Sequence, residues 1–249
     1  MKERPYILTI AGFDPSNGAG LTADIKTFES LKCYGLSVCT ANTIQNDIEF
    51  TNCYWTPIEV IKEQITILFN RFSIDVVKIG IIENWVTMSQ VIDLLLDLNP
   101  KIKIVLDPVL KSSTDFKIQK GFNASLFNEI LAKIYMITPN YIEIESLFPE
   151  KTIEETIEHI RAKTNLYLKG GHNIEALGVD YLYTKDKQYT LNPNRVDISE
   201  KHGSGCVLSS AIASHIALGY STLKSSYRGK RYVERVLSSN KTLLGYHKS

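Results

Sequence analysis

The chain has 249 residues, with 28 Lys or Arg and 27 Asp or Glu, so its formal net charge is +1. Its hydrophobic fraction of 44% and charged fraction of 22% are usual for a soluble globular protein. The charge balance argues against nucleic acid or an anionic membrane as a general partner. No apolar run approaches the roughly 20 residues that span a bilayer, and the N-terminus lacks a signal-peptide core, so we expect a cytoplasmic protein.

Short apolar runs alternate along the chain with segments whose apolar residues recur at helical spacing. The runs predict strands and the spaced segments predict helices. In chain order, we expect strands at residues 6–12, 36–43, 74–82, 102–106, 135–138, 166–169, 179–184 and 188–191. We expect helices at residues 21–31, 58–68, 86–98, 122–132, 142–147, 153–163, 206–218 and 222–244.

This alternation favours an α/β fold in which helices cover both faces of a mostly parallel sheet. No linker, low-complexity tract or internal repeat divides the chain, so residues 1–249 are expected to form a single domain. Ligands of such sheets bind beyond the carboxyl ends of the strands. The polar and glycine-rich residues that follow each strand are therefore the candidates for function.

Residues 18–23 match the dinucleotide-binding fingerprint G-x-G-x-x-[GA] only formally. Residues 14–17 intervene between the strand end and the first glycine, and no acidic residue ends the next strand. Glycines that let a loop pack closely on a helix explain the segment equally well. The chain contains no G-x-x-x-x-G-K-[ST] motif, which excludes a P-loop nucleotide site.

The Gly-Ser-Gly-Cys segment at residues 203–206 is more informative, because it opens a predicted helix. Its glycines allow backbone N–H groups to converge where the positive end of the helix points, which creates an anion site. A transferring phosphoryl group needs such a site. The helix end is expected to lower the pKa of the Cys206 thiol from about 8.5, which makes Cys206 a candidate base or nucleophile. The alternative is a glycine turn in which this cysteine only packs.

The other cysteines, Cys33, Cys39 and Cys53, form neither a C-x-x-C pair nor a cluster with zinc-site spacing. We expect them to be reduced thiols, mostly buried.

Oxygen-bearing side chains follow two strands, at Asp107 and at Asn140 with Glu143. Such groups suit Mg²⁺, which keeps waters and bridges substrate phosphates, so Asp107 and Glu143 are candidate metal ligands. Lys169, beside two glycines, is a candidate contact for a nucleotide phosphate. Each residue also has an ordinary explanation as a turn former, a helix cap or a surface lysine. Together they favour phosphoryl transfer, which depends on positioning and electrostatics.

Six segments, in order and in spacing, resemble the hydroxymethylpyrimidine/phosphomethylpyrimidine kinases of thiamine biosynthesis, a family of the ribokinase-like superfamily. The segments are residues 11–20, 23–27, 107–109, 138–140, 169–172 and 202–206. The resemblance implies a three-layer αβα sandwich with a central, mostly parallel sheet. It also implies ATP- and Mg²⁺-dependent phosphorylation of 4-amino-5-hydroxymethyl-2-methylpyrimidine, and then of its monophosphate to the diphosphate.

The resemblance assigns the pyrimidine site to Gly12, Asp24 and Gln45, with Val109 beside it. Asp24 matches an acidic residue that contacts the pyrimidine, and a carboxylate is chemically suited to accept a hydrogen bond from the exocyclic amine.

The same resemblance places Asn140 and Glu143 in an N-x-x-E motif associated with Mg²⁺ and phosphate, and Lys169 near the phosphates of ATP. It makes Cys206 the base that takes the proton of the hydroxymethyl oxygen during in-line attack on the γ-phosphorus. Backbone N–H groups of Gly203, Ser204, Gly205 and Cys206 would hold the developing charge. The helix at 222–244 is expected to border the adenine site, with its basic cluster at 228–231 on a solvated face.

Three departures from the family pattern occur. Phe13 stands where Ser or Thr is usual, Ser204 replaces Thr, and residues 111–115 match the family's S-G-D flap only in part. One alternative function is a pyridoxal kinase of the same lineage, because both substrates carry a hydroxymethyl group on a six-membered aza-ring. Another is a catalytically silent pyrimidine-binding module. A homodimer is expected, since oligomers occur among relatives of this kind.

Overall fold

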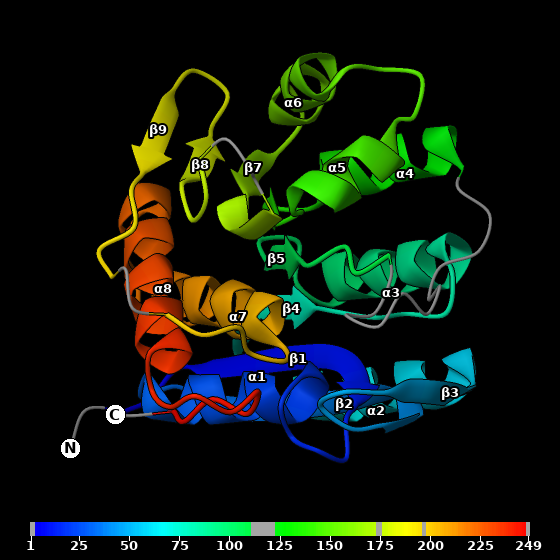
Figure 1. Ribbon diagram of the computed structural model, residues 1–249. Helices are drawn as coiled ribbons and strands as arrows, with labels where there is room; N and C mark the ends of the chain where they lie inside the picture. The colour runs from blue at the N-terminus through cyan, green and yellow to red at the C-terminus, as the bar shows by residue number, and fades with distance from the viewer. Residues whose placement is uncertain (1–2, 111–122, 173–175, 196–197, 248–249) are drawn as a thin grey trace.

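A single continuous sheet runs through the computed structural model, which describes residues 3–110, 123–172, 176–195 and 198–247 (Figure 1). Its strands are β1 (Tyr6–Phe13), β2 (Tyr34–Gln45), β3 (Phe50–Trp55), β4 (Ile74–Ile79), β5 (Lys103–Leu106), β6 (Met136–Ile137), β7 (Asn165–Leu168), β8 (Asp180–Tyr183) and β9 (Gln188–Leu191). The strand order is β3-β2-β1-β4-β5-β6-β7-β8-β9. The pairs from β2 to β7 are parallel, whereas the pairs β2–β3, β7–β8 and β8–β9 are antiparallel.

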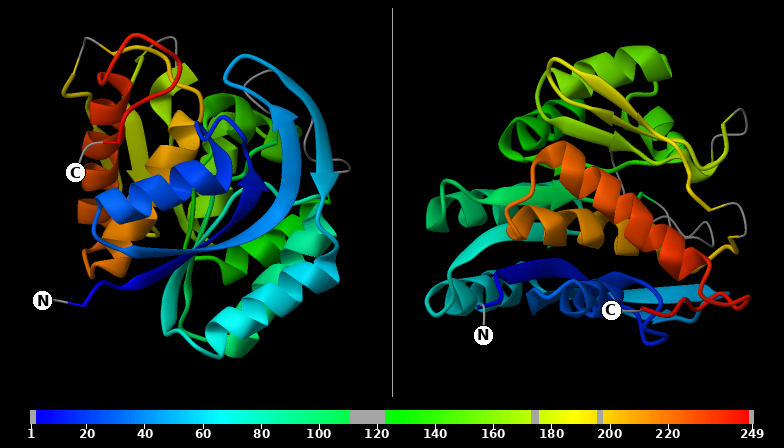
Figure 2. Two further views of the ribbon diagram at one scale, coloured as in Figure 1. Left: turned by 90° about the horizontal axis from the view of Figure 1, so that it is seen from below. Right: turned by 90° about the vertical axis from the view of Figure 1, so that its left-hand side faces the viewer.

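Helices cover both faces of this sheet. They are α1 (Gly20–Ser30), α2 (Ile58–Phe69), α3 (Trp85–Leu98), α4 (Ala124–Lys133), α5 (Tyr141–Leu147), α6 (Ile153–Arg161), α7 (Ser204–Ala217) and α8 (Thr222–Leu237). Figures 1 and 2 show α1, α7 and α8 on one side of the sheet and α2 to α6 on the other. The three-layer αβα arrangement expected from the sequence is confirmed. None of the helices within the described ranges is long and apolar enough to cross a membrane.

The core consists of two apolar layers, one on each side of the sheet. Neighbouring residues of a strand point to opposite faces, so Ile7 and Val76 pack with α1, α7 and α8. Leu8 and Val77, the next residues along, pack with the helices of the other layer. Burial of both faces explains why the parallel strands are continuous apolar runs in the sequence rather than alternating ones.

Two elements differ from the sequence prediction. The strand β3 was not expected, and it pairs with β2 through a turn in which Asn46 Oδ1 accepts hydrogen bonds from the backbone N–H groups of Ile48 and Glu49, both at 2.8 Å. The last helix ends at Leu237 instead of continuing to residue 244. Beyond it, the Asn240 side chain donates to Leu244 O at 2.9 Å and closes a turn that helical periodicity does not reveal.

The order of the strands predicts a ligand-binding crevice at the carboxyl end of β1. From β1 the chain passes first to β2 on one side and later to β4 on the other, so the connections diverge at the carboxyl end of β1. In open α/β sheets such a divergence leaves the crevice in which ligands bind. The flap at residues 111–115, singled out in the sequence, lies outside the described residues.

The close crossing of α7 and α8 depends on Gly229. A Cβ atom at this position would lie 2.5 Å from Cγ1 and 3.1 Å from the backbone nitrogen of Ile212. We therefore predict that Gly229→Leu lowers the free energy of unfolding by at least about 1–3 kcal/mol, as overpacking does in well-packed cores. Chemical denaturation measures the change. Arg228→Leu, at the exposed neighbouring position, is the control, and equal stability of the two variants would contradict this account of the crossing.

Candidate active site

The start of α7 lies against the glycine-rich loop that precedes α1. Its N-cap residue, Gly203, has a φ of +73°, and a Cβ there would lie 2.1 Å from Gly18 O. Both the left-handed backbone and the close approach require glycine. Gly203 therefore allows the two loops to meet where the positive end of the α7 dipole points.

Asp14 fixes the conformation of the glycine-rich loop. Its carboxylate accepts hydrogen bonds from the N–H groups of Ser16, Gly18 and Ala19 at 2.8, 3.1 and 2.8 Å. His202 Nε2 lies 3.0 Å from Asp14 Oδ2, which links the loop to the residues before α7. Burial alone would raise the pKa of Asp14, but the bonds from His202, Ala19 and Ser16 lower it overall. The sequence contained this aspartate within a motif, without indicating its role.

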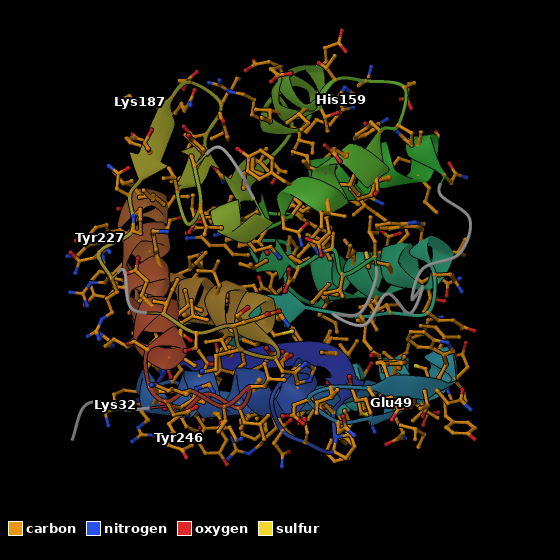
Figure 3. The ribbon with its side chains drawn as sticks, viewed as in Figure 1. Lys32, Glu49, His159, Lys187, Tyr227 and Tyr246 are labelled. Atoms are coloured by element: carbon orange, nitrogen blue, oxygen red, sulfur yellow. The ribbon has the colours of Figure 1, made fainter. Side chains whose placement is uncertain are left out.

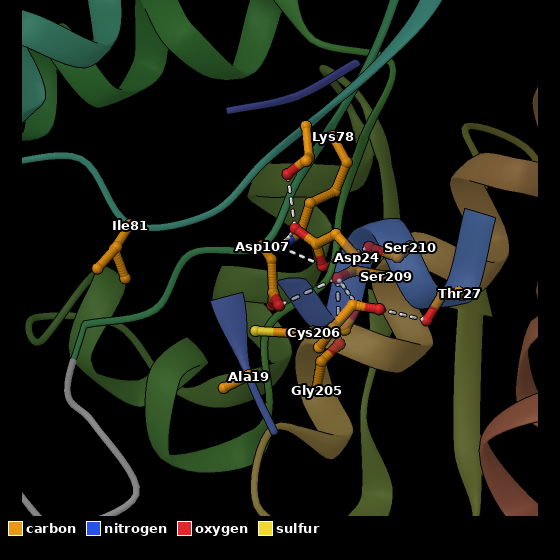
Figure 4. A network of polar contacts seen from close by, with 12 residues as sticks. Ala19, Asp24, Thr27, Lys78, Ile81, Asp107, Gly205, Cys206, Ser209 and Ser210 are labelled. Atoms are coloured by element: carbon orange, nitrogen blue, oxygen red, sulfur yellow. Dashed lines mark hydrogen bonds and ion pairs between the residues drawn. The ribbon is translucent and has the colours of Figure 1, made fainter. Parts of the chain in front are cut away.

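Asp24 and Lys78 form a buried ion pair behind this loop, and neither side chain has exposed surface (Figure 4). Lys78 Nζ lies 2.9 and 3.1 Å from the two carboxylate oxygens of Asp24. Thr9 and Ser210 donate to the same carboxylate, each at 2.6 Å. Donors from β1, β4 and α7 thus contact both oxygens of Asp24, and its contact with the pyrimidine stays a prediction. The sequence signal that could have indicated this pair is Lys78 itself, a lysine within the apolar run of β4. A buried charge needs a partner of opposite charge.

Lys169 lies between two carboxylates that come from different strand ends. Its Nζ is 2.9 Å from Asp107 Oδ1 and 3.3 Å from Glu143 Oε2. Asp107 also accepts hydrogen bonds from Thr138 Oγ1 at 3.2 Å and from Ser209 Oγ at 3.1 Å. The structure thus brings together three residues that the sequence selected separately, and it adds two hydroxyl groups that the sequence did not suggest.

The charges of this trio follow from burial and mutual attraction. Burial raises the pKa of Asp107, but the charges of Lys169 and Lys78 lower it by more than burial raises it. The pKa of Asp107 is therefore lowered overall. Burial raises the pKa of Glu143 beyond what Lys169 can offset, and repulsion from Asp107 adds to this. Burial opposes the charge of Lys169, but Asp107 and Glu143 outweigh it and raise the pKa of Lys169. The site therefore presents a stably charged ammonium group.

Protein groups contact both carboxylates that were predicted to bind Mg²⁺. Asn140 and Glu143 form a capping box at the start of α5, with bonds of 2.7 and 2.8 Å, so the helix-cap explanation of Glu143 is confirmed. The Lys169 ammonium already occupies the position between Asp107 and Glu143 that a cation would take. Over the described ranges, no three His, Cys, Asp or Glu side chains are grouped so that they could hold a metal. The assignment of Asp107 and Glu143 as Mg²⁺ ligands stays a prediction.

Cys206 lies in the first turn of α7 and is half-buried. Burial raises the pKa of its thiol to about 11, Lys78 acts in the opposite direction, and Asp24 and Asp107 add to the increase. The expected lowering of this pKa is wrong, because burial and two nearby carboxylates raise the pKa by more than Lys78 and the backbone of Gly20 lower it. Figure 4 shows the sulfur on the same side of α7 as the Asp107 carboxylate.

The other predicted pyrimidine contacts lie at the same edge of the sheet. Gly12 is buried near the end of β1, Gln45 ends β2 and is half-buried, and Val109 follows β5. Phe13, which departs from the family pattern, is the last residue of β1 and is half-buried. Their contact with a pyrimidine stays a prediction.

A pocket opens between β8 and α8, and we call it the β8–α8 pocket. Asn140, Lys169 and Gly205 line it, and Leu208, Val233 and Leu237 add apolar wall. Lys230 also lines it and is only 3% exposed, so the prediction that residues 228–231 form a solvated face is wrong for this lysine. The outer face of α8 carries Tyr227 instead (Figure 3).

Comparison with known proteins identifies the family. Residues 14–249 match the family model described as phosphomethylpyrimidine kinase. The chain belongs to the phosphomethylpyrimidine kinase family. This confirms the resemblance inferred from the six sequence segments.

Relatives in this family support the assignment along the whole described fold. A hydroxymethylpyrimidine/phosphomethylpyrimidine kinase of Aquifex aeolicus is 32% identical over 246 residues, which are 95% of this chain and 95% of that protein. A bifunctional thiamine biosynthesis protein of Methanocaldococcus jannaschii is 34% identical, covering 97% of this chain and 55% of its own length. The chain spans about half the length of several curated relatives that it matches.

Solved structures of the phosphomethylpyrimidine kinase family and of pyridoxal kinases share the fold. A phosphomethylpyrimidine kinase from Clostridium difficile aligns with a TM-score of 0.77 and 32% identity, over 92% of this chain and 98% of that one. A pyridoxal kinase from Staphylococcus aureus in complex with ADP aligns with a TM-score of 0.85 over 97% of this chain and 91% of that one. Its identity is 23%, so this likeness shows the fold alone.

The raised pKa of Cys206 predicts slow alkylation at neutral pH. Because the thiolate is the nucleophile, the rate of reaction with iodoacetamide should rise about tenfold per pH unit and level off only near a pH of about 11. Peptide mass spectrometry after timed labelling follows Cys206 separately from the other cysteines. A plateau below pH 9 would show that the thiol is activated in the free protein.

Proposed function

We propose that the chain phosphorylates 4-amino-5-hydroxymethyl-2-methylpyrimidine with ATP, and then phosphorylates the monophosphate to the diphosphate, as a step of thiamine biosynthesis. Membership of the phosphomethylpyrimidine kinase family supports this proposal. The observation that carries it is the charged Lys169 at the junction of the β8–α8 pocket and the glycine-flanked start of α7. A cation, backbone N–H groups and a helix end together suit a transferring phosphoryl group.

We assign the nucleotide to the β8–α8 pocket. Leu208, Val233 and Leu237 offer the apolar contact that suits a base. Lys169 and Gly205 lie toward the start of α7, where the phosphates would face the positive helix end. We expect Mg²⁺ to enter with ATP and to keep phosphate oxygens and waters as ligands.

We assign the acceptor to the edge formed by β1, β2 and β5, near Gly12, Gln45 and Val109. The hydroxymethyl oxygen forms a bond to the γ-phosphorus while the bond from that phosphorus to the β,γ-bridging oxygen breaks, which leaves ADP. The hydroxyl proton passes to the Cys206 sulfur in its thiolate form, which becomes the neutral thiol. Lys169 and the N–H groups at 203–206 would hold the charge of the transferring group, as loose phosphoryl transfer requires.

We further propose a cytoplasmic homodimer. Light scattering on the purified chain measures its mass in solution against the 28.1 kDa of one chain.

Product analysis tests the proposed substrate. With ATP and the pyrimidine alcohol, we predict that chromatography shows the monophosphate first and the diphosphate later, with one ADP formed per phosphoryl group transferred. Pyridoxal under the same conditions is the comparison substrate. A higher kcat/KM for pyridoxal would replace the proposed substrate, and a lack of ADP release with either alcohol would support a silent binding module.

Replacement of Cys206 tests the proposed base. Loss of a general base lowers rates about 10²–10⁴-fold, so Cys206→Ala should reduce kcat by about this factor with little change in pyrimidine affinity. Because the thiol pKa is raised to about 11, the thiolate fraction increases with pH throughout the neutral range. The wild-type kcat should therefore rise from pH 6 to pH 9, whereas that of Cys206→Ala should not. A variant with near-wild-type kcat would remove Cys206 from this role.

A further inference from the structure

Lys230 is a buried lysine that lines the β8–α8 pocket, and the proposed phosphoryl transfer assigns it no part. Its Nζ donates to Gly178 O at 2.6 Å and to Asp180 Oδ2 at 2.9 Å. Glu234 Oε1 is 4.0 Å away, one helical turn further along α8. Two of the three ammonium donors are thus directed to β8 and the loop before it. The side chain is tied to the pocket wall instead of pointing freely into the pocket.

Asp180 connects Lys230 to two other elements. Its Oδ1 accepts from the N–H of Gly170 at 2.7 Å, and its Oδ2 accepts from the hydroxyl of Tyr167 at 2.5 Å. The carboxylate therefore joins α8, the end of β7 and the short 3₁₀ turn Gly170–His172. Burial and the Asp180 carboxylate raise the pKa of Tyr167 well above its usual value, so this hydroxyl keeps its proton and remains a donor.

The hydrogen bond from Gly170 bears directly on Lys169. The N–H of Gly170 belongs to the peptide group that follows Lys169, so Asp180 fixes the plane of that peptide. On its other side, Lys169 donates its own N–H to Pro139 O at 2.9 Å. The backbone of Lys169 is thus held at both ends, and its ammonium reaches Asp107 and Glu143 from a fixed starting point.

We propose that Lys230 is a positioning residue for the nucleotide phosphates, acting through Asp180 and Gly170 on Lys169. This inference rests on the proposed function, since Lys169 matters there as a phosphate contact. A buried carboxylate that loses its cation becomes costly, and it relaxes by taking up a proton or water. Without Lys230, Asp180 would release the peptide after Lys169, and Lys169 would lose its alignment with the start of α7.

Lys230→Met and Lys230→Arg test this role, with Lys224→Met as the matched control. Lys224 is an exposed lysine on the same helix. Small displacements in a site cost up to about 10²-fold in rate, so kcat/KM for ATP in Lys230→Met should fall by about this factor. The KM for the pyrimidine alcohol should change little. Lys230→Arg keeps the charge and should recover part of the loss, and Lys224→Met should behave as wild type.

Calorimetric titration with ADP separates this inference from the proposed function, because it needs no turnover. ADP binding should weaken in Lys230→Met, even if the acceptor proved to be another alcohol. Thermal unfolding of each variant shows that it is folded at the assay temperature. Equal loss of affinity for ADP and for the pyrimidine alcohol would indicate general destabilisation and overturn the proposal.

A double-mutant cycle with Asp180→Asn locates the effect in the pair. If Lys230 acts through Asp180, the double variant should bind ADP no more weakly than Lys230→Met, since it carries no unpaired buried carboxylate. Additive losses from the two substitutions would show that Lys230 acts independently of Asp180, which would also overturn the proposal.

Discussion

The partly buried ammonium of Lys169, paired with Asp107 and Glu143, is the interaction on which the arrangement of the candidate site depends. Asp107 comes from the end of β5 and Glu143 from α5, and the Lys169 ammonium lies between their carboxylates. Two buried negative charges at such a separation repel strongly in a medium of low polarity. Lys169 removes that repulsion, and it thereby fixes the distance between two strand ends and the start of α7.

Pairs of a lysine with a buried carboxylate occur at two further positions. Lys78 pairs with Asp24, and Lys230 pairs with Asp180, each at 2.9 Å. Buried pairs of this kind contribute little net stability compared with apolar residues, because desolvation offsets their attraction. Their effect is geometric, since each carboxylate also collects hydroxyl or N–H donors from other elements. Apolar packing joins the helix layers to the sheet, and these ion pairs hold a few polar groups in fixed positions at one edge of the sheet.

Much of the fold was accessible from the sequence because it depends on local pattern. The apolar runs gave the parallel strands, and helical spacing gave the helices that cover them. The sequence pattern did not predict β3 or the end of α8. Side-chain hydrogen bonds of Asn46 and Asn240 determine both features, and such bonds leave no periodic pattern in the sequence. In the site, residues near strand ends were found by type, whereas the partners of Asp24 and Lys230 were not. Those partners are 54 and 50 positions away in the chain, and only the fold brings them together.

Cys206 shows why a local rule is insufficient for electrostatics. A cysteine in the first turn of a helix is expected to ionise easily. In the folded chain, burial and the carboxylates of Asp24 and Asp107 outweigh the charge of Lys78 and raise the pKa of the thiol to about 11, so most of it keeps its proton at neutral pH. Catalysis of phosphoryl transfer depends mainly on positioning and on electrostatic stabilisation of the transferring group. In the proposed reaction the site therefore relies on a fixed cation and fixed N–H groups, and the small fraction of Cys206 that is thiolate at neutral pH takes the proton.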